Sequence, residues 1–153
     1  MNYLEELRRL VGHRPLLMVG ATVLILDREN RLLLLKRVDN LCWGPPGGSL
    51  ELGEVVESAA KRETLEETGL EVRNLTLLNV FSGPDQFYRY PNGDEVNVVA
   101  VVYLCKDFQG EVRLSDEHTE SRWFMLSEIP VDLSPPIKPI IEYFQRSSSV
   151  FEP

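Results

Sequence analysis

The segment from Gly48 to Leu70 constrains this chain more than any other part of its sequence. It reads GSLELGEVVESAAKRETLEETGL, which predicts a loop followed by a helix that ends at Gly69. At about 100° per residue, Glu63 and Glu67 lie about 40° apart around the helix, and Glu66 lies about 60° to the other side of Glu63. Three carboxylates therefore share one helix face, which is the kind of oxygen cluster that a hard cation such as Mg²⁺ prefers.

An acidic helix face also occurs where nothing is bound. Like charges at helical spacing cost only a few tenths of a kcal/mol per pair in water, so a solvated acidic surface is stable enough to be common. The cluster alone therefore does not separate a cation site from a surface face. The other residues of the segment, and their spacing from the cluster, distinguish the two possibilities.

The spacing of the whole segment resembles the Nudix motif, G-x5-E-x7-R-E-U-x-E-E-x-G-U, in which U is apolar. The matching positions are Gly48, Glu54, Arg62, Glu63, Glu66, Glu67, Gly69 and Leu70. At a usage of about 6% per residue type, seven fixed positions match by accident on the order of 10⁻⁸ of the time. Thr64 departs from the motif by replacing its first apolar residue, for which we expect a small stability cost and no loss of chemistry.

The resemblance implies an α/β fold, namely an α/β/α sandwich with a mixed sheet and a loop-helix-loop catalytic motif. Nudix proteins typically use Mg²⁺ or Mn²⁺ to hydrolyse a phosphoanhydride bond in a nucleoside diphosphate linked to another group. The implied substrate is a nucleotide sugar such as ADP-ribose, or a ribonucleoside or deoxyribonucleoside triphosphate. The competing hypothesis is a non-catalytic nucleotide-sensing module, but such modules usually carry a degraded motif or an added DNA-binding domain.

The resemblance also assigns roles within the motif. The implied metal ligands are the carbonyl group of Gly47 and the carboxylates of Glu63, Glu66 and Glu67. Arg62 and Glu54 correspond to an orienting pair, in which a bidentate guanidinium holds carboxylates in place. The alternative for this pair is an ordinary surface ion pair worth under about 1 kcal/mol.

The general base is expected either within the motif or on the acidic loop at 114–120. Glu117 is the first candidate, Glu120 the second and Glu63 the competitor inside the motif. A solvated acidic turn is an equally good interpretation of this loop. We expect His118 to be a surface residue, because a lone histidine on a loop usually is.

Several residues outside the motif are candidates for substrate binding. Arg37, at the end of a predicted strand, has the planar fork that matches phosphate oxygens. Trp43 precedes the glycine pair and either lines the site or holds the loop, with the structural role slightly favoured. Phe87, Tyr88 and Tyr90 could stack on a base or pack on a strand face, and packing is the commoner reason for such aromatic residues.

Composition and charge narrow the class of protein. The 153 residues, 43% of them apolar, predict one globular domain over 1–153. A net charge of −8 argues against binding of nucleic acid polymers, and the longest apolar run, at 16–26, is too short to cross a membrane. Two cysteines without a C-x-x-C pair favour a reducing cytoplasm. The pattern leaves monomer and homodimer open.

The sequence also predicts the helices and strands along the chain. A helix within 1–12 is capped by Asn2 and ended by Gly12, and apolar runs at 18–26 and 32–35 form a hairpin buried on both faces. Further strands are expected at 71–81, 86–90, 95–104 and 121–126. A final helix starts after Ser134 and ends near Gln145, and a frayed tail follows at 147–153.

Overall fold

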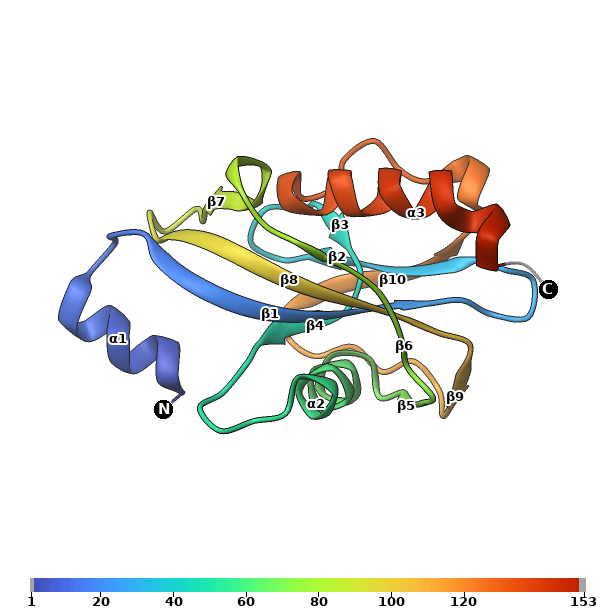
Figure 1. Cartoon of the computed structure of the whole chain (residues 1–153), viewed down its shortest axis with the longest axis horizontal. Coiled ribbons are helices and arrows are strands. Elements are labelled where there is room, and N and C mark those ends of the chain that lie inside the picture. Colours follow the sequence, from blue (N-terminus) through green and yellow to red (C-terminus); the bar gives the residue numbers. More distant parts are fainter. Residues whose placement is uncertain (1, 152–153) are drawn as a thin grey trace.

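The chain folds into three layers, with helices on both faces of a layer of strands (Figure 1). The computed structural model describes residues 2–151, and their side chains as far as Ser147. Helix α2 (Val56–Thr68) covers one face of the strands and helix α3 (Lys138–Phe151) covers the other. The predicted α/β/α sandwich is therefore confirmed.

The other elements complete these layers. Helix α1 spans Tyr3–Val11, and short 3₁₀ turns occupy Pro84–Gln86, Leu126–Glu128 and Pro135–Ile137. The strands are β1 (Leu16–Ile25), β2 (Leu32–Arg37), β3 (Trp43–Gly44), β4 (Gly47–Ser49), β5 (Glu71–Arg73), β6 (Thr76–Phe81), β7 (Phe87–Arg89), β8 (Glu95–Cys105), β9 (Asp107–Gln109) and β10 (His118–Phe124). None of the helices within residues 2–151 combines the length and apolar character that crossing a membrane requires.

The largest sheet has the strand order β4-β1-β8-β6, with β7 also paired to β8. Strands β1 and β8 run parallel over ten residue pairs, from Leu16 opposite Val96 to Ile25 opposite Cys105, and the other pairings are antiparallel. This is the mixed sheet expected from the sequence. A second sheet has the order β10-β2-β3, and β5 pairs with β9 in a third.

Both faces of β2 and of the second half of β1 are buried, as their apolar runs predict, whereas Leu17 and Val19 leave one face of the start of β1 exposed. Leu24 and Leu32 belong to the core beneath α3, where Phe144 is 1% exposed. Val23 and Leu33, their neighbours in sequence, point to the opposite core beneath α2. Because successive side chains of a strand alternate between faces, continuous apolar runs supply both cores at once.

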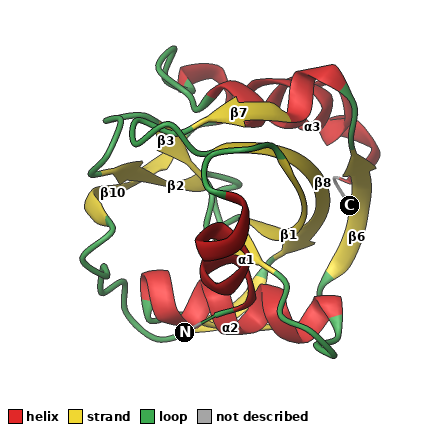
Figure 2. Ribbon diagram, turned by 90° about the vertical axis from the view of Figure 1, so that its left-hand side faces the viewer, coloured by secondary structure: helices red, strands yellow, loops and turns green. Residues whose placement is uncertain are grey.

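Helix α1 lies beside the three layers and contributes no buried residue (Figure 2). Its predicted capping box is confirmed, since Asn2 and Glu5 exchange side-chain and backbone hydrogen bonds. Polar contacts hold the helix in place: Arg8 donates to the Glu95 carbonyl at 2.6 Å, and the Tyr3 backbone donates to Glu51 at 3.2 Å. The start of α1 thereby borders the loop that leads into α2.

Two predicted strand arrangements are wrong. The hairpin of 18–26 and 32–35 does not form a ladder, because β1 and β2 enter different sheets and share a single bridge between Leu26 and Leu32. The expected strand at 71–81 is broken near Asn74, whose φ of 55° is incompatible with extended backbone. The break sends β5 and β6 to different sheets.

The C-terminal elements also differ from the prediction. Strand β10 starts at His118, three residues earlier than expected, because pairing with β2 continues to Arg37 across an irregularity near Glu120. Helix α3 continues past Gln145 to Phe151, so the part of the expected frayed tail at 147–151 is helical. Residues 152–153 of that tail lie outside the described residues.

Two leucines of β1 test the energetic role of the core. Leu24 is fully buried, whereas Leu17 is 76% exposed on the same strand. We expect Leu24→Ala to lower the free energy of unfolding by about 2–5 kcal/mol, because it removes buried surface and leaves a cavity. Leu17→Ala should change it by under about 0.5 kcal/mol. Urea denaturation followed by circular dichroism measures both, and equal losses would contradict the assignment of the core.

Candidate functional site

A cavity of about 370 Å³ opens beside strand β4 and the carboxylates of helix α2. One end is acidic and glycine-rich, and is lined by Gly47, Gly48, Glu63, Glu67, Glu117 and His118. The other end is lined by aromatic, neutral polar and apolar side chains, including Gln86, Tyr88, Tyr90, Ser134 and Ile137. The cavity therefore offers one environment suited to cations and another suited to a flat, partly polar molecule.

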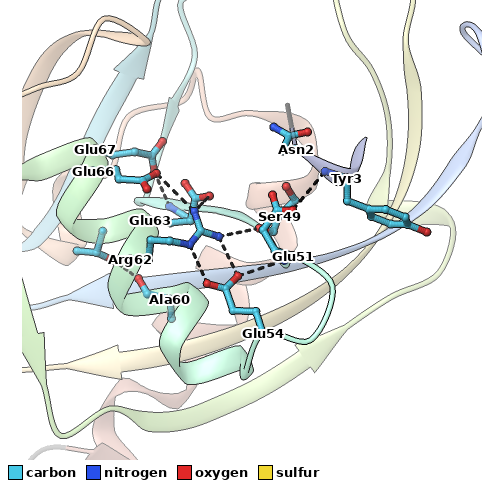
Figure 3. Close-up of polar contacts among 12 residues, drawn as sticks. Asn2, Tyr3, Ser49, Glu51, Glu54, Ala60, Arg62, Glu63, Glu66 and Glu67 are labelled. Atoms are coloured by element: carbon cyan, nitrogen blue, oxygen red, sulfur yellow. Dashed lines mark hydrogen bonds and ion pairs between the residues drawn. The ribbon is translucent and has the colours of Figure 1, made fainter. Parts of the chain in front are cut away.

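Arg62 ties the motif together at the acidic end (Figure 3). Its guanidinium donates to both carboxylate oxygens of Glu54, at 2.7 and 2.9 Å, and to Glu63 at 2.9 Å. A further bond reaches the Ser49 carbonyl at 3.2 Å. The side-chain bond from Arg62 lowers the pKa of Glu54, and the bonds to Glu54 and Glu63 raise the pKa of Arg62. The pair thus connects the loop at Glu54, strand β4 and helix α2, so it is more than an isolated surface ion pair.

Glu67 is the most deeply buried carboxylate of the motif. It is 6% exposed and accepts a 2.8 Å hydrogen bond from the backbone N–H of Gly47. Gly47 faces Thr22 at a position of β4 that does not bond to β1, so its carbonyl also points away from β1. Burial raises the pKa of Glu67 to about 8, and the nearby charges of Glu63 and Glu117 add to this shift.

Glu63 packs against the backbone of Gly48. A Cβ atom at Gly48 would clash with the Glu63 carboxylate, so the absence of a side chain allows this approach. Burial raises the pKa of Glu63, while the bond from Arg62 opposes the shift. Glycine is thus required here by the position of a carboxylate in the next element.

Glu117 reaches the acidic end from the other sheet. The Glu117 carbonyl accepts a 3.0 Å bond from the Val38 backbone, which anchors this loop to the end of β2. The carboxylate belongs with Glu67 and His118 to a group whose ligand atoms lie within 4.8 Å of one another. The loop is therefore not merely a solvated turn, because it brings a third carboxylate to the cavity.

The prediction that His118 is a surface residue is wrong. Its side chain is 5% exposed, and its Nε2 lies 3.8 Å from a Glu67 oxygen. Burial and the charge of Arg37 lower its pKa. Sequence reasoning missed this histidine because nothing local shows that β10 begins there and turns the ring inward.

This donor set fits a divalent cation. Glu63, Glu67 and Glu117 converge at this end of the cavity, where Glu67 is buried and Glu117 is exposed. Their mutual repulsion is only partly offset by Arg62 beside Glu63 and by Arg37 near Glu67. The buried Nδ1 of His118 has no hydrogen-bond partner among the described residues. Carboxylates and a free backbone carbonyl are ligands for Mg²⁺ or Mn²⁺, and an imidazole is a ligand for transition metals. A bound cation would favour the ionised carboxylates.

Two of the candidate carboxylates stand outside the cavity. Glu66 is beside Glu67 on the same helix face, but its side chain is 57% exposed and lies 3.5 Å from the Arg62 guanidinium. Glu120 is 45% exposed and lies 3.8 Å from Arg122, away from the acidic end. Of the three candidates for the general base, Glu117 and Glu63 line the cavity and Glu120 does not.

Arg37 lines the cavity between its two ends. Its guanidinium donates to both oxygens of Asp39, at 2.8 and 2.7 Å, and lies 5.8 Å from the centre of the Tyr90 ring. The bond to Asp39 raises the pKa of Arg37 and lowers that of Asp39. Arg37 is therefore a fixed positive charge at the cavity wall.

Of the aromatic candidates for substrate binding, some line the cavity and others do not. Trp43 is 6% exposed, packs edge-to-face on Phe124 at 5.1 Å, and is absent from the cavity wall, so it holds the loop. Phe87 is 41% exposed and points away, whereas Tyr88 and Tyr90 line the cavity. Alternation along β7 accounts for this split, since neighbouring side chains face opposite ways.

Two polar residues of the cavity were missed by the sequence analysis. Gln86 is 2% exposed and donates to the Pro136 carbonyl at 2.9 Å. Ser134 is 8% exposed, and its buried hydroxyl has no hydrogen-bond partner among the described residues. The alternation that includes Tyr88 could have identified Gln86, but Ser134 comes from a distant turn and carries no local signal.

Comparison with known proteins agrees with this geometry. The family model described as "NUDIX domain" matches residues 16–144. The ADP-ribose pyrophosphatase of Methanocaldococcus jannaschii is 38% identical over 109 residues, which cover 69% of this chain and 61% of that protein. The asymmetrical bis(5'-nucleosyl)-tetraphosphatase of Mus musculus is 38% identical over 106 residues, covering 63% and 65%. The match thus spans less than two thirds of either relative.

A solved structure shows the same fold at higher coverage. The MutT NUDIX hydrolase from Burkholderia pseudomallei has a TM-score of 0.70 and is 36% identical, with 85% of this chain and 98% of that chain covered. This similarity covers the three layers and the motif together.

The two glycines before the helix predict different outcomes on substitution. A Cβ at Gly47 would lie 2.6 Å from the Ala21 carbonyl oxygen, which is fixed in β1, so Gly47→Ala should cost about 1–3 kcal/mol of unfolding free energy. Gly48→Ala meets only the flexible end of Glu63 and should cost about 1 kcal/mol, the net value of one hydrogen bond. In the second variant the Glu63 carboxylate resonance should shift in a ¹³C NMR spectrum. An unshifted resonance would contradict the proposed contact.

Burial of Glu67 predicts a pH dependence of stability in the metal-free protein. Because its pKa is raised from 4.5 to about 8, the folded chain keeps a proton that the unfolded chain releases within this window. The free energy of unfolding should therefore fall as pH rises from 4.5 to 8, by up to about 1.4 kcal/mol per pH unit. Glu67→Gln lacks this contribution, so its curve in urea and EDTA should be flatter. Parallel curves would refute the raised pKa.

Proposed function

Because this chain belongs to the NUDIX domain family, we propose that it hydrolyses a phosphoanhydride bond in a nucleoside diphosphate linked to another group, with Mg²⁺ or Mn²⁺ as cofactor. The observation that carries the proposal is the convergence of Glu63, Glu67 and Glu117 at one end of a cavity large enough for a nucleotide. Two free cysteines are compatible with a reducing cytoplasm, which we propose as its compartment.

The substrate's phosphates belong at the acidic end. A bound divalent ion supplies charge neutralisation at the pyrophosphate and acidifies a water molecule. Glu63, Glu67 and the Gly47 carbonyl are the proposed ligands within the cavity. Glu66 lies outside the cavity and is the fourth proposed ligand, which would have to turn toward the ion to bind it. Without the cation, a substrate of the same charge sign as the carboxylates would be repelled.

Other residues of the motif position this set. Arg62 holds Glu63 while Glu54 holds Arg62, so the carboxylates stay in place when charge develops at the phosphorus. Arg37, fixed by Asp39, is the proposed contact for a phosphate oxygen. Glu117 and Glu63 are the two candidates to accept the proton of the attacking water, since both line the cavity.

The far end of the cavity supports a nucleoside as the other part of the substrate. Tyr88 and Tyr90 present aromatic rings in an edge-to-face pair 4.9 Å apart, and a base can stack on such a ring. The Ser134 hydroxyl offers an unused hydrogen-bonding group there. The two relatives with 38% identity carry different substrate names, so a nucleotide sugar such as ADP-ribose, a dinucleoside polyphosphate and a nucleoside triphosphate are the candidates to compare.

A panel of these nucleotides with Mg²⁺ or Mn²⁺ tests the function. We expect the protein to release phosphate or a nucleoside monophosphate from at least one of them. Glu67→Gln should lower kcat at least about 100-fold, beyond the usual effect of groups that only support a metal ligand. Glu57→Gln, an exposed carboxylate of the same helix, is the matched control and should keep full activity.

The panel also separates an enzyme from a sensor. Nucleotide binding without product, in calorimetry of the wild-type protein with either metal ion, would favour the sensing module over hydrolysis. Full turnover by Glu67→Gln would reject the proposed metal ligands while leaving the family assignment intact.

A further inference from the structure

His118 has an environment that protein contacts alone do not explain. Its side chain is 5% exposed, yet neither ring nitrogen has a hydrogen-bond partner among the described residues. Leaving buried polar groups unpaired costs free energy, so such an imidazole calls for a ligand in the cavity that it lines.

The carboxylates beside His118 identify the kind of ligand. Its Nε2 lies 3.8 Å from a Glu67 oxygen, which is too long for a hydrogen bond. Two ligands of one small divalent ion lie at most about 4.2 Å apart, since each is about 2.1 Å from the ion. The ligand atoms of Glu67, Glu117 and His118 all fall within 4.8 Å of one another, so a small side-chain adjustment suffices to enclose an ion.

We propose that His118 is a nitrogen ligand for a divalent ion held with Glu67 and Glu117, and that it biases the site toward Mn²⁺ over Mg²⁺. This rests on the proposed function, because it concerns the same cavity. Imidazole binds transition metals, whereas carboxylates, carbonyls and water are the ligands that suit Mg²⁺. Mn²⁺ accepts the same oxygen ligands as Mg²⁺, but it is the transition metal of the two proposed cofactors and so gains more from an added imidazole. A mixed nitrogen and oxygen set therefore discriminates between ions that an all-carboxylate site treats more alike.

The proposal also separates the two candidates for the general base. If Glu117 takes the place of Glu63 in the ligand set, the charge of Glu117 is committed to the ion, and Glu63 is left to accept the proton. Glu63 is suited to that role because it lines the cavity while Arg62 fixes its orientation.

Electron spin-echo envelope modulation of Mn²⁺ bound to the full chain is the direct test, since it detects nitrogen coupled to the ion. The chain has two histidines, and the other, His13, is bonded to Asp94 at 2.7 Å outside the cavity. We expect ¹⁴N modulation in the wild-type protein and in His13→Gln, and none in His118→Gln. Selective ¹⁵N labelling of histidine should change the modulation without any substitution, which keeps the test valid if His118→Gln unfolds.

Metal competition supplies the second measurement. His118→Gln should weaken Mn²⁺ binding by about tenfold or more, and Mg²⁺ binding, measured by displacement of Mn²⁺, should change much less. Mn²⁺ binding without ¹⁴N modulation in the wild-type protein would overturn the role of His118 alone. Absence of Mn²⁺ binding, with or without nucleotide, would instead count against the proposed metal-dependent function.

Discussion

The Arg62 guanidinium is the contact on which the acidic end of the cavity depends. It bonds to Glu54 from the loop, Glu63 from helix α2 and the Ser49 carbonyl at the end of β4. These three segments diverge in the fold, and a planar donor with five N–H groups is the side chain that can bridge all of them. The carboxylates of the helix are thereby held near one another despite their repulsion.

The backbone supplies the other half of this arrangement. Strand β4 pairs with the central strand β1 and so places Gly47 and Gly48 directly against helix α2. One glycine donates its N–H to Glu67 and the other makes room for Glu63. Because the second half of β1 is buried on both faces, this strand cannot shift without disturbing both cores. The position of the site is thus set by the packing of the apolar strands.

The sequence correctly predicted those features of the fold that depend on residues close together in the chain. The cap at Asn2 and the burial of β2 and of the second half of β1 follow from spacing within one or two elements. The pairing of Arg62 with Glu54 was implied by the resemblance to the Nudix motif. The hairpin prediction failed because β2 pairs with β3 and with β10 instead of β1, and β10 lies about 80 residues farther along the chain. The prediction of one strand at 71–81 failed for a similar reason. The turn at Asn74 is too short to be recognised in the sequence, and the segments on either side of it, β5 and β6, pair with different strands.

The sequence by itself determined the family, the three-layer fold and the carboxylate face of α2, because a helix motif is complete within 23 residues of continuous chain. Tertiary structure alone decided which residues outside the motif meet that face. Glu117 comes from the loop before β10, His118 from the first position of β10, and Ser134 from a turn before α3, whereas Trp43 packs in the core. The positions of these residues depend on which strands of different sheets end beside one another. The periodicities of strands and helices, two and 3.6 residues, carry no information about such long-range contacts.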